Sequence, residues 1–154
     1  MRRTDRQRDR NFALEVIDQC EYGVAAFSTG AGEPYCIPLS LVRVRDELYF
    51  HCAMEGRKLE LMRANPKVCV SFVSSNVAAK DKFTTYFKSA VVVGTAYEVT
   101  EDSAKIEALR ALCQKLTPAN MEHFDQAIEK SLGRTGVWGI HMEQVTGKEK
   151  MQKE

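Results

Sequence analysis

Residues 47–73 read ELYFHCAMEGRKLELMRANPKVCVSFV. They predict a strand, a turn, a short helix and a second strand, in that order. The segment LYFHC is aromatic and apolar enough for a strand, and Gly56 frees the backbone just before the apolar spacing becomes helical. Asn65 ends the helix, because a residue that precedes proline is disfavoured in the helical region. We therefore expect a helix to begin at the Gly-Arg-Lys turn of residues 56–58.

This turn predicts an anion site. The first turn of a helix leaves backbone N–H groups without partners, and these groups favour negative charge. Arg57 offers a planar fork of donors and Lys58 a point charge, and both suit an anionic group. The alternative is that the two cations are solvated surface charges, which are common. The turn alone does not separate these interpretations, so the rest of the chain has to decide.

Length and composition indicate one soluble domain, residues 1–154. The chain is 44% hydrophobic and 28% charged, and its net charge of +1 argues against nucleic acid or an anionic membrane as a partner. The first ten residues, MRRTDRQRDR, are basic, but no apolar segment follows that could form a signal peptide or a membrane span. We expect a cytoplasmic protein with a frayed terminus at 1–10, for which a nucleic-acid arm is the alternative, and a charged tail at 147–154.

The cysteines and histidines do not predict a metal site. None of the five cysteines forms a C-x-x-C pair, and the three histidines are scattered without metal-ligand spacing. The cysteines lie mostly in apolar patterns, which favours buried, reduced thiols. The alternative is that one of them is redox-active near a ligand.

The pattern along the chain is mainly β with peripheral helices, an α+β arrangement. Neighbouring strands follow one another, so an antiparallel, closed or partly closed barrel fits better than a doubly wound parallel sheet. No G-x-G-x-x-G follows a strand, which disfavours a Rossmann site. A helix is expected at 11–20, a mobile loop at 74–82 and a helical hairpin at 102–132. The six strands are expected at 22–28, 34–44, 47–52, 68–73, 86–100 and 135–145.

Three segments together resemble a known family: PYCIPLSLV (34–42), the stretch from 47 to 72, and YFKSAVVVGTAYEV (86–99). They are similar to the FMN-binding split barrels of the pyridoxamine 5'-phosphate oxidase-like superfamily, and most similar to its nitroimidazole-resistance (Nim) type of flavin reductase. The likeness runs from residue 22 to 148 and includes the terminal V-x-G-I-x-x-x-x-x-T-G-K. It implies a six-stranded antiparallel split β-barrel.

The resemblance also implies the site residues. FMN would lie at a homodimer interface, with Arg57 and Lys58 on its phosphate and Gly56 allowing close approach. His51 would contact the flavin or a substrate, as a low-ranking catalytic candidate, or else serve as a structural hydrogen bonder. The other residues that would lie near the flavin are Ile37, Pro38, Leu39, Ser40, Cys52, Lys88, Ser89 (from the neighbouring subunit) and Trp138. For the first four of these and for Trp138, the alternative is that they are core strand residues.

The implied function is an FMN-dependent oxidoreductase that reduces a small acceptor, with a nitroaromatic as one candidate and a nicotinamide nucleotide as a candidate donor. Oxidation of vitamin B6 is disfavoured, because the end of the chain, VWGIHMEQVTGKEKMQKE, offers no arginine-histidine pair for a substrate phosphate. The alternative is a non-catalytic module that stores or senses flavin, haem or the deazaflavin coenzyme F420.

Overall fold

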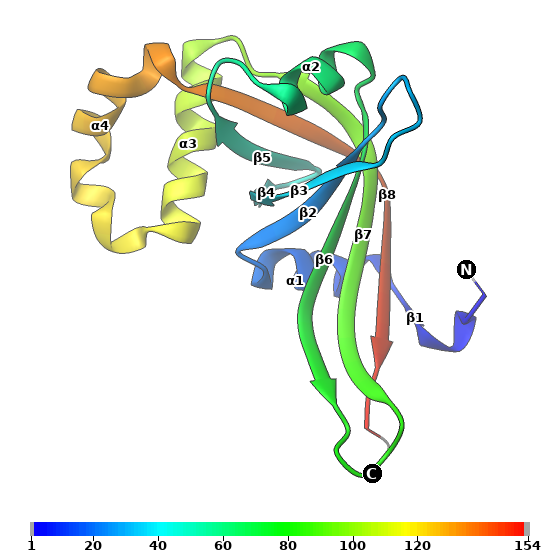
Figure 1. The fold of residues 1–154 in the computed structure, drawn as a ribbon. Coiled ribbons are helices and arrows are strands. Elements are labelled where there is room, and N and C mark those ends of the chain that lie inside the picture. The colour runs from blue at the N-terminus through cyan, green and yellow to red at the C-terminus, as the bar shows by residue number, and fades with distance from the viewer. Residues whose placement is uncertain (1, 153–154) are drawn as a thin grey trace.

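The computed structural model describes residues 2–152, in which one antiparallel sheet curls into a split barrel with helices around it (Figure 1). Its strands are β1 (Gln7–Arg8), β2 (Tyr22–Phe27), β3 (Tyr35–Ser40), β4 (Val42–Val44), β5 (Glu47–Cys52), β6 (Lys67–Ala78), β7 (Thr85–Glu98) and β8 (Gly136–Lys150). Its α-helices are α1 (Arg10–Gln19), α2 (Arg57–Ala64), α3 (Asp102–Leu116) and α4 (Phe124–Ser131). Short 3-10 helices lie at η1 (Thr4–Arg6), η2 (Pro118–His123) and η3 (Leu132–Arg134).

The antiparallel split barrel expected from the sequence is confirmed, but the number of strands is corrected. The sheet follows the order β3-β2-β6-β7-β8-β5-β4, and β1 adds to it by pairing with β8. The difference arises at Leu41, where the expected strand 34–44 is divided into β3 and β4. Leu41 is buried in the core, and there the chain passes from one end of the strand order to the other. The sheet thereby curls back on itself, and β3 contacts β5.

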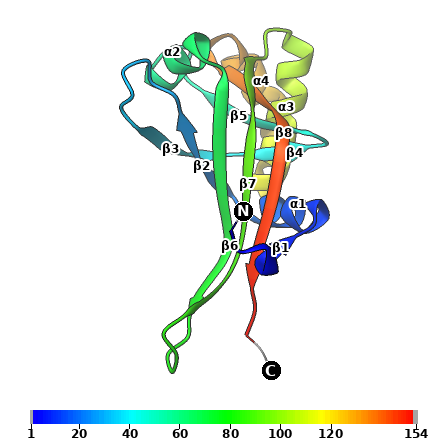
Figure 2. The same cartoon turned by 90° about the vertical axis from the view of Figure 1, so that its right-hand side faces the viewer.

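The long strands β6, β7 and β8 extend beyond the barrel as an arm (Figures 1 and 2). Residues 74–78, expected in a mobile loop, instead continue β6 and pair with β7 after a bulge between Val73 and Ser75. Only the tip of the hairpin is irregular, and Ala79 N–H donates to the Thr84 carbonyl across it at 3.0 Å. Ladder hydrogen bonds on both strands therefore outweigh the polar composition of this segment.

Described residues near both termini pair within the sheet. Residues 7 and 8 pair with residues 148 and 147 of β8, and the Arg8 side chain donates to the buried Glu149 carboxylate at 2.7 Å. The Asp9 side chain caps α1 by accepting from Phe12 N–H at 2.9 Å. β8 likewise includes residues 146–150, of which 147–150 were expected in the charged tail. Met1 and residues 153–154, which belong to the expected termini, lie outside the described residues.

Two hydrophobic clusters organise the interior. The larger one fills the barrel, and α1 and α2 contribute to it through buried side chains such as Ile17 and Leu59. Gly147 lets α1 approach β8, since a Cβ there would lie 2.9 Å from Phe12 and 3.1 Å from Ala13. The second cluster lies outside the barrel, where α3 and α4 pack on β4, β5 and β8 around Val137. The helical hairpin thus covers one outer patch of the sheet (Figure 1).

Across residues 2–152, no helix combines the length and the apolar character needed to span a membrane.

Candidate functional site

The end of β5 and the start of α2 form a cationic turn, residues 56–58. Gly56 has φ +131°, a conformation that side chains disfavour, although a Cβ there would meet no atom within 4 Å. Its carbonyl accepts from the N–H groups of Leu59 at 2.9 Å and Glu60 at 3.2 Å. The N–H groups of Arg57 and Lys58 make no hydrogen bond to any described residue. Two backbone donors therefore remain available at the helix start.

The side chains of this cationic turn are also available to an anion. Arg57 is 56% exposed, and its one ion pair with a described residue is a loose 3.6 Å contact with the exposed carboxylate of Glu60. Lys58 is half-buried and makes no ion pair within residues 2–152. Burial raises the pKa of the nearby Cys52 thiol, and the positive charge of Lys58 opposes that rise. Two cations and two N–H groups thus lie within two consecutive residues, a donor set suited to phosphate.

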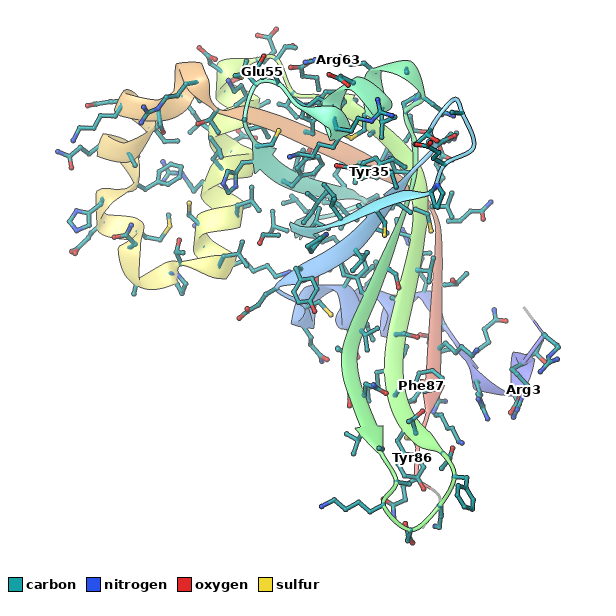
Figure 3. The ribbon with its side chains drawn as sticks, in the orientation of Figure 1. Arg3, Tyr35, Glu55, Arg63, Tyr86 and Phe87 are labelled. Atoms are coloured by element: carbon teal, nitrogen blue, oxygen red, sulfur yellow. The ribbon has the colours of Figure 1, made fainter. Side chains whose placement is uncertain are left out.

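Trp138 lies inside the barrel near α2. The side chain is 3% exposed, and the guanidinium of Arg63 lies 5.8 Å from its ring centroid. Arg63, whose position Figure 3 shows, also donates to the Glu98 carboxylate at 3.3 Å. The indole Nε1 is buried and has no hydrogen-bond partner among the described residues. Trp138 is therefore a core residue with one unsatisfied donor.

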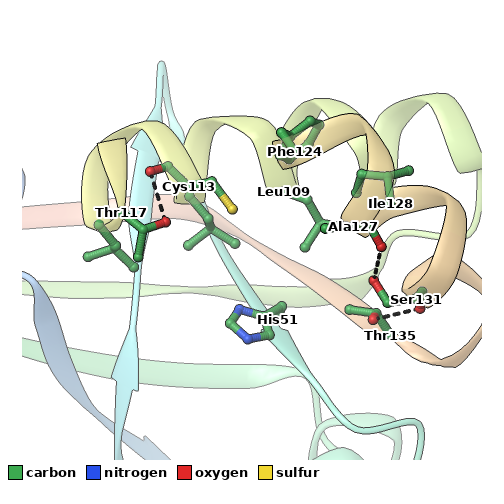
Figure 4. A pocket seen from close by; sticks show the side chains of 11 residues that line it. His51, Leu109, Cys113, Thr117, Phe124, Ala127, Ile128, Ser131 and Thr135 are labelled. Atoms are coloured by element: carbon green, nitrogen blue, oxygen red, sulfur yellow. Dashed lines mark hydrogen bonds between the residues drawn. The ribbon is translucent and has the colours of Figure 1, made fainter. Parts of the chain in front are cut away.

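His51 and Cys52 lie on opposite faces of β5. Cys52 packs against the barrel cluster, whereas His51 is exposed and faces the helical hairpin. There a cavity of about 340 Å³ lies between β5 and the two helices, with Leu109, Phe124 and Ile128 in its walls (Figure 4). The structure thus places His51 at this cavity, separated from Cys52 by the sheet.

The other predicted contacts divide between two regions. On β3, Ile37 and Leu39 pack against the barrel cluster, while Pro38 and Ser40 face outward. Lys88 and Ser89 lie on β7, on the same arm as Phe87, which Figure 3 shows at the opposite end of the sheet from Glu55. The Lys88 ammonium lies 3.8 Å from the Glu149 carboxylate there. Within one chain, the structure does not bring the arm residues to the cationic turn.

The outer face of the sheet carries two uncharged rows that cross five strands. Four large side chains in or beside these rows are substantially exposed: Val24 38% and Val91 36% lie in a row, and Tyr22 59% and Val73 56% lie beside it. The strand registers define the rows as Pro38, Val24, Ser71, Val91 and Thr146, and Cys36, Ala26, Cys69, Val93 and Gln144. We call these two rows the uncharged face.

A polar cluster that the sequence analysis missed lies farther along the outer face. The Glu47 carboxylate accepts from the Tyr97 hydroxyl at 3.0 Å and lies 2.6 Å from His141 Nδ1. Burial and the neighbours Tyr49 and Glu47 raise the pKa of Tyr97, and Glu47 raises that of His141. Gly139 lies between the two tyrosines in the register. The only signal in the sequence is the alternation of polar residues on three strands whose pairing it does not reveal.

The described residues thus combine an antiparallel split barrel with a cationic turn at the start of α2. The family model described as pyridoxamine 5'-phosphate oxidase matches residues 9–149, and the chain belongs to this family. A search of curated protein sequences found no match.

Solved structures with the same fold include three informative neighbours. A protein from Bacteroides thetaiotaomicron named for 5-nitroimidazole antibiotic resistance is 24% identical, with a TM-score of 0.76 over 91% of this chain and 83% of that one. The flavocytochrome Anf3 from Azotobacter vinelandii is 20% identical, with a TM-score of 0.84 over 99% and 72%. An FAD-binding protein from Mesorhizobium loti is 26% identical, with a TM-score of 0.70 over 95% and 98%. The neighbours thus include flavin-binding and haem-containing proteins.

Proposed function

We propose that this protein is an FMN-dependent oxidoreductase whose flavin phosphate binds at the cationic turn. The observation that carries the proposal is the donor set of Arg57 and Lys58, with two side-chain cations and two unpartnered N–H groups. Membership of the pyridoxamine 5'-phosphate oxidase family and the flavin-binding neighbours support the choice of a flavin. When bound, FMN would supply the electron-transfer chemistry, and the protein would supply binding and orientation.

The donor set fits a terminal phosphate in both number and kind. Arg57 can give two parallel N–H bonds to phosphate oxygens, while Lys58 adds a point charge. Each charge-assisted hydrogen bond contributes about 1.5–3 kcal/mol. The weak contact between Arg57 and Glu60 is lost at little cost, because both groups are exposed. Anion binding would therefore replace only one loose ion pair.

The proposal includes a homodimer that joins the uncharged face of one copy to that of another. Its exposed valines and small residues lack the charges that normally keep a sheet surface monomeric. In such a dimer, Lys88 and Ser89 of the second copy would approach the flavin, which would explain why one chain leaves them far from the cationic turn. The acceptor is proposed to be a small molecule, with a nitroaromatic as a candidate and a nicotinamide nucleotide as the donor.

The test is cofactor retention in the double variant Arg57→Ala/Lys58→Ala. We expect the wild-type protein to bind FMN in a one-to-one ratio and the variant to lose it while remaining folded. The matched control is Lys130→Ala/Arg134→Ala, which removes the same charge from exposed positions on and after α4. FMN titration followed by flavin fluorescence measures both. Equal affinity in the three proteins would place the flavin phosphate elsewhere, and mass spectrometry of the released ligand would distinguish FMN from FAD and coenzyme F420.

A second candidate function is non-catalytic binding of flavin or haem. It is favoured by the exposed imidazole of His51, which makes no hydrogen bond to a described residue, and by the flavocytochrome among the neighbours. Neutral imidazole is a common iron ligand. Haem titration distinguishes this function, because a sharp, shifted Soret band that returns to the band of free haem in His51→Ala would support it. Rapid NADH-dependent reduction of a bound flavin and reoxidation by an acceptor would contradict it.

A further inference from the structure

The cavity between β5 and the helical hairpin has the size of a small-molecule site. Its volume is about 340 Å³, and leucine, isoleucine, phenylalanine and alanine side chains of α3 and α4 make up six of its eleven lining residues. A cavity of about 150 Å³ with similar walls holds benzene, and ligand pockets begin at about 300 Å³. The space therefore suits a ligand of about two fused rings.

The hydroxyl groups in the wall of this cavity are already satisfied by the protein. Ser131 Oγ donates to the Ala127 carbonyl at 2.7 Å, and Thr135 Oγ1 donates to the Ser131 carbonyl at 2.9 Å. Thr117 Oγ1 donates to the Cys113 carbonyl at 3.3 Å (Figure 4). These hydroxyl protons bind helix carbonyls, so the three hydroxyls have no proton left to donate to a ligand oxygen.

Apart from the weakly polar Cys113 thiol, the imidazole of His51 is the hydrogen-bond donor that the described wall residues leave for a ligand. Figure 4 shows it alone on the β5 side of the cavity, facing the helices, and neither ring nitrogen bonds a described residue. Among the described residues, no lysine, arginine, aspartate or glutamate lines the cavity. A charged ligand would lose its hydration there without gaining a counter-ion. These walls consequently disfavour the flavin phosphate, which the cationic turn suits instead.

We propose that this cavity binds a neutral aromatic ketone, quinone or nitroarene of about two rings, with its oxygen accepting a hydrogen bond from His51. The identification of this ligand as the substrate of the oxidoreductase rests on the proposed function, whereas the binding itself does not. The cavity opens on the face of β5 opposite to Cys52, so the ligand and the phosphate have separate sites next to the same strand end.

The test uses two probes of nearly the same shape, 1-acetylnaphthalene and 1-isopropylnaphthalene, of which only the first carries an oxygen. Equilibrium dialysis of the full chain, with and without FMN, gives Kd for both. A neutral hydrogen bond should change the ratio of the two Kd values by about 2- to 10-fold between wild type and His51→Phe, and His51→Gln should restore part of that change. NMR of the His51 ring nitrogens should show a shift with the ketone alone.

A second pair of variants tests the location. Ala127 lines the cavity and is exposed, so Ala127→Leu should fill the space without unfolding the protein and weaken binding of both probes. The neighbouring Gln126 does not line the cavity, and Gln126→Leu should leave both Kd values unchanged. Equal Kd ratios in wild type and His51→Phe, or displacement of the probes by FMN or haem, would overturn the proposal. Probe binding to protein that fails to bind FMN would support this site while contradicting the proposed function.

Discussion

Lys115 provides a sensitive test of how the helical hairpin is held on the barrel. This α3 side chain donates from its ammonium group to the carbonyl of Cys20 at 2.6 Å and to that of Leu41 at 3.0 Å. It also lies 3.5 Å from the Ile17 carbonyl. One side chain thereby joins α3 to the end of α1 and to Leu41, the residue that divides β3 from β4. Burial lowers the pKa of Lys115, so these bonds are made at the cost of partial desolvation.

Lys115→Met keeps the apolar stem and removes the three donors. Two hydrogen bonds from a charged donor contribute about 3–6 kcal/mol, and loss of the desolvation cost offsets part of this, which leaves a net destabilisation of about 2–4 kcal/mol. For a chain of this length the melting temperature should fall by roughly 4–16 °C. Urea unfolding followed by circular dichroism measures the free energy directly, and the m value should stay constant.

Two lysine variants calibrate that measurement. Lys105 is 9% exposed but makes one such bond, to the Leu132 carbonyl at 3.1 Å, so Lys105→Met should cost about half as much. Lys130 is exposed on α4, and Lys130→Met should change the free energy of unfolding by less than about 0.5 kcal/mol. If Lys115→Met were no more destabilising than Lys130→Met, the three carbonyls would not hold the hairpin in place.

Three further changes have defined outcomes. Gly139→Ala should lower the free energy of unfolding by about 1–3 kcal/mol, because the new Cβ would lie 2.3 Å from Tyr97 Cζ. The cost should vanish in a Tyr97→Ala background, and urea titration of the four proteins measures this; an equal cost in both backgrounds would contradict the prediction. His141 should stabilise the fold fully below pH 6.5 and lose that contribution as the pH rises through its raised folded pKa, so His141→Gln should show a flatter dependence of unfolding free energy on pH between 6 and 9. Gly56→Ala should weaken FMN binding in fluorescence titration, since φ +131° strains an L-residue; unchanged affinity would show that the turn relaxes freely.

The sequence predicted those elements whose own residues fix their periodicity. The helix that begins at Arg57 and ends before Asn65 was expected there, because a glycine and a proline mark both ends. The division at Leu41 was not predictable in the same way. Both halves continue one apolar pattern, and the break depends on pairing with β2 on one side and β5 on the other. Strand pairing that is distant in sequence overrides the local pattern.

The arm formed by β6, β7 and β8 shows the same limit of local sequence patterns, here in polar segments that nevertheless form strands. Ser74, Ser75 and Asn76 have the composition of a loop, yet β7 pairs with this segment as far as Ala78. Residues 147–150, of which the last three are charged, likewise form a strand because β7 and β1 supply their hydrogen bonds. Asn76 is exposed whereas Glu149 is buried, and both pair in an antiparallel ladder, so a polar residue can belong to a strand at either level of exposure.

The candidate site could be predicted only as far as strand alternation reaches. Successive side chains of a strand point to opposite faces, so strand alternation alone predicts that His51 and Cys52 lie on opposite faces of β5. Which face met the helical hairpin depended on where α3 and α4 pack, and the sequence of β5 contains no information about that packing. This separation has a chemical consequence. A single strand end can present its charged turn to an anion and its outward histidine to an apolar cavity, because the sheet keeps the two environments apart. A change confined to Arg57 and Lys58 should therefore leave the cavity intact, and a change confined to Ala127 should leave the cationic turn intact.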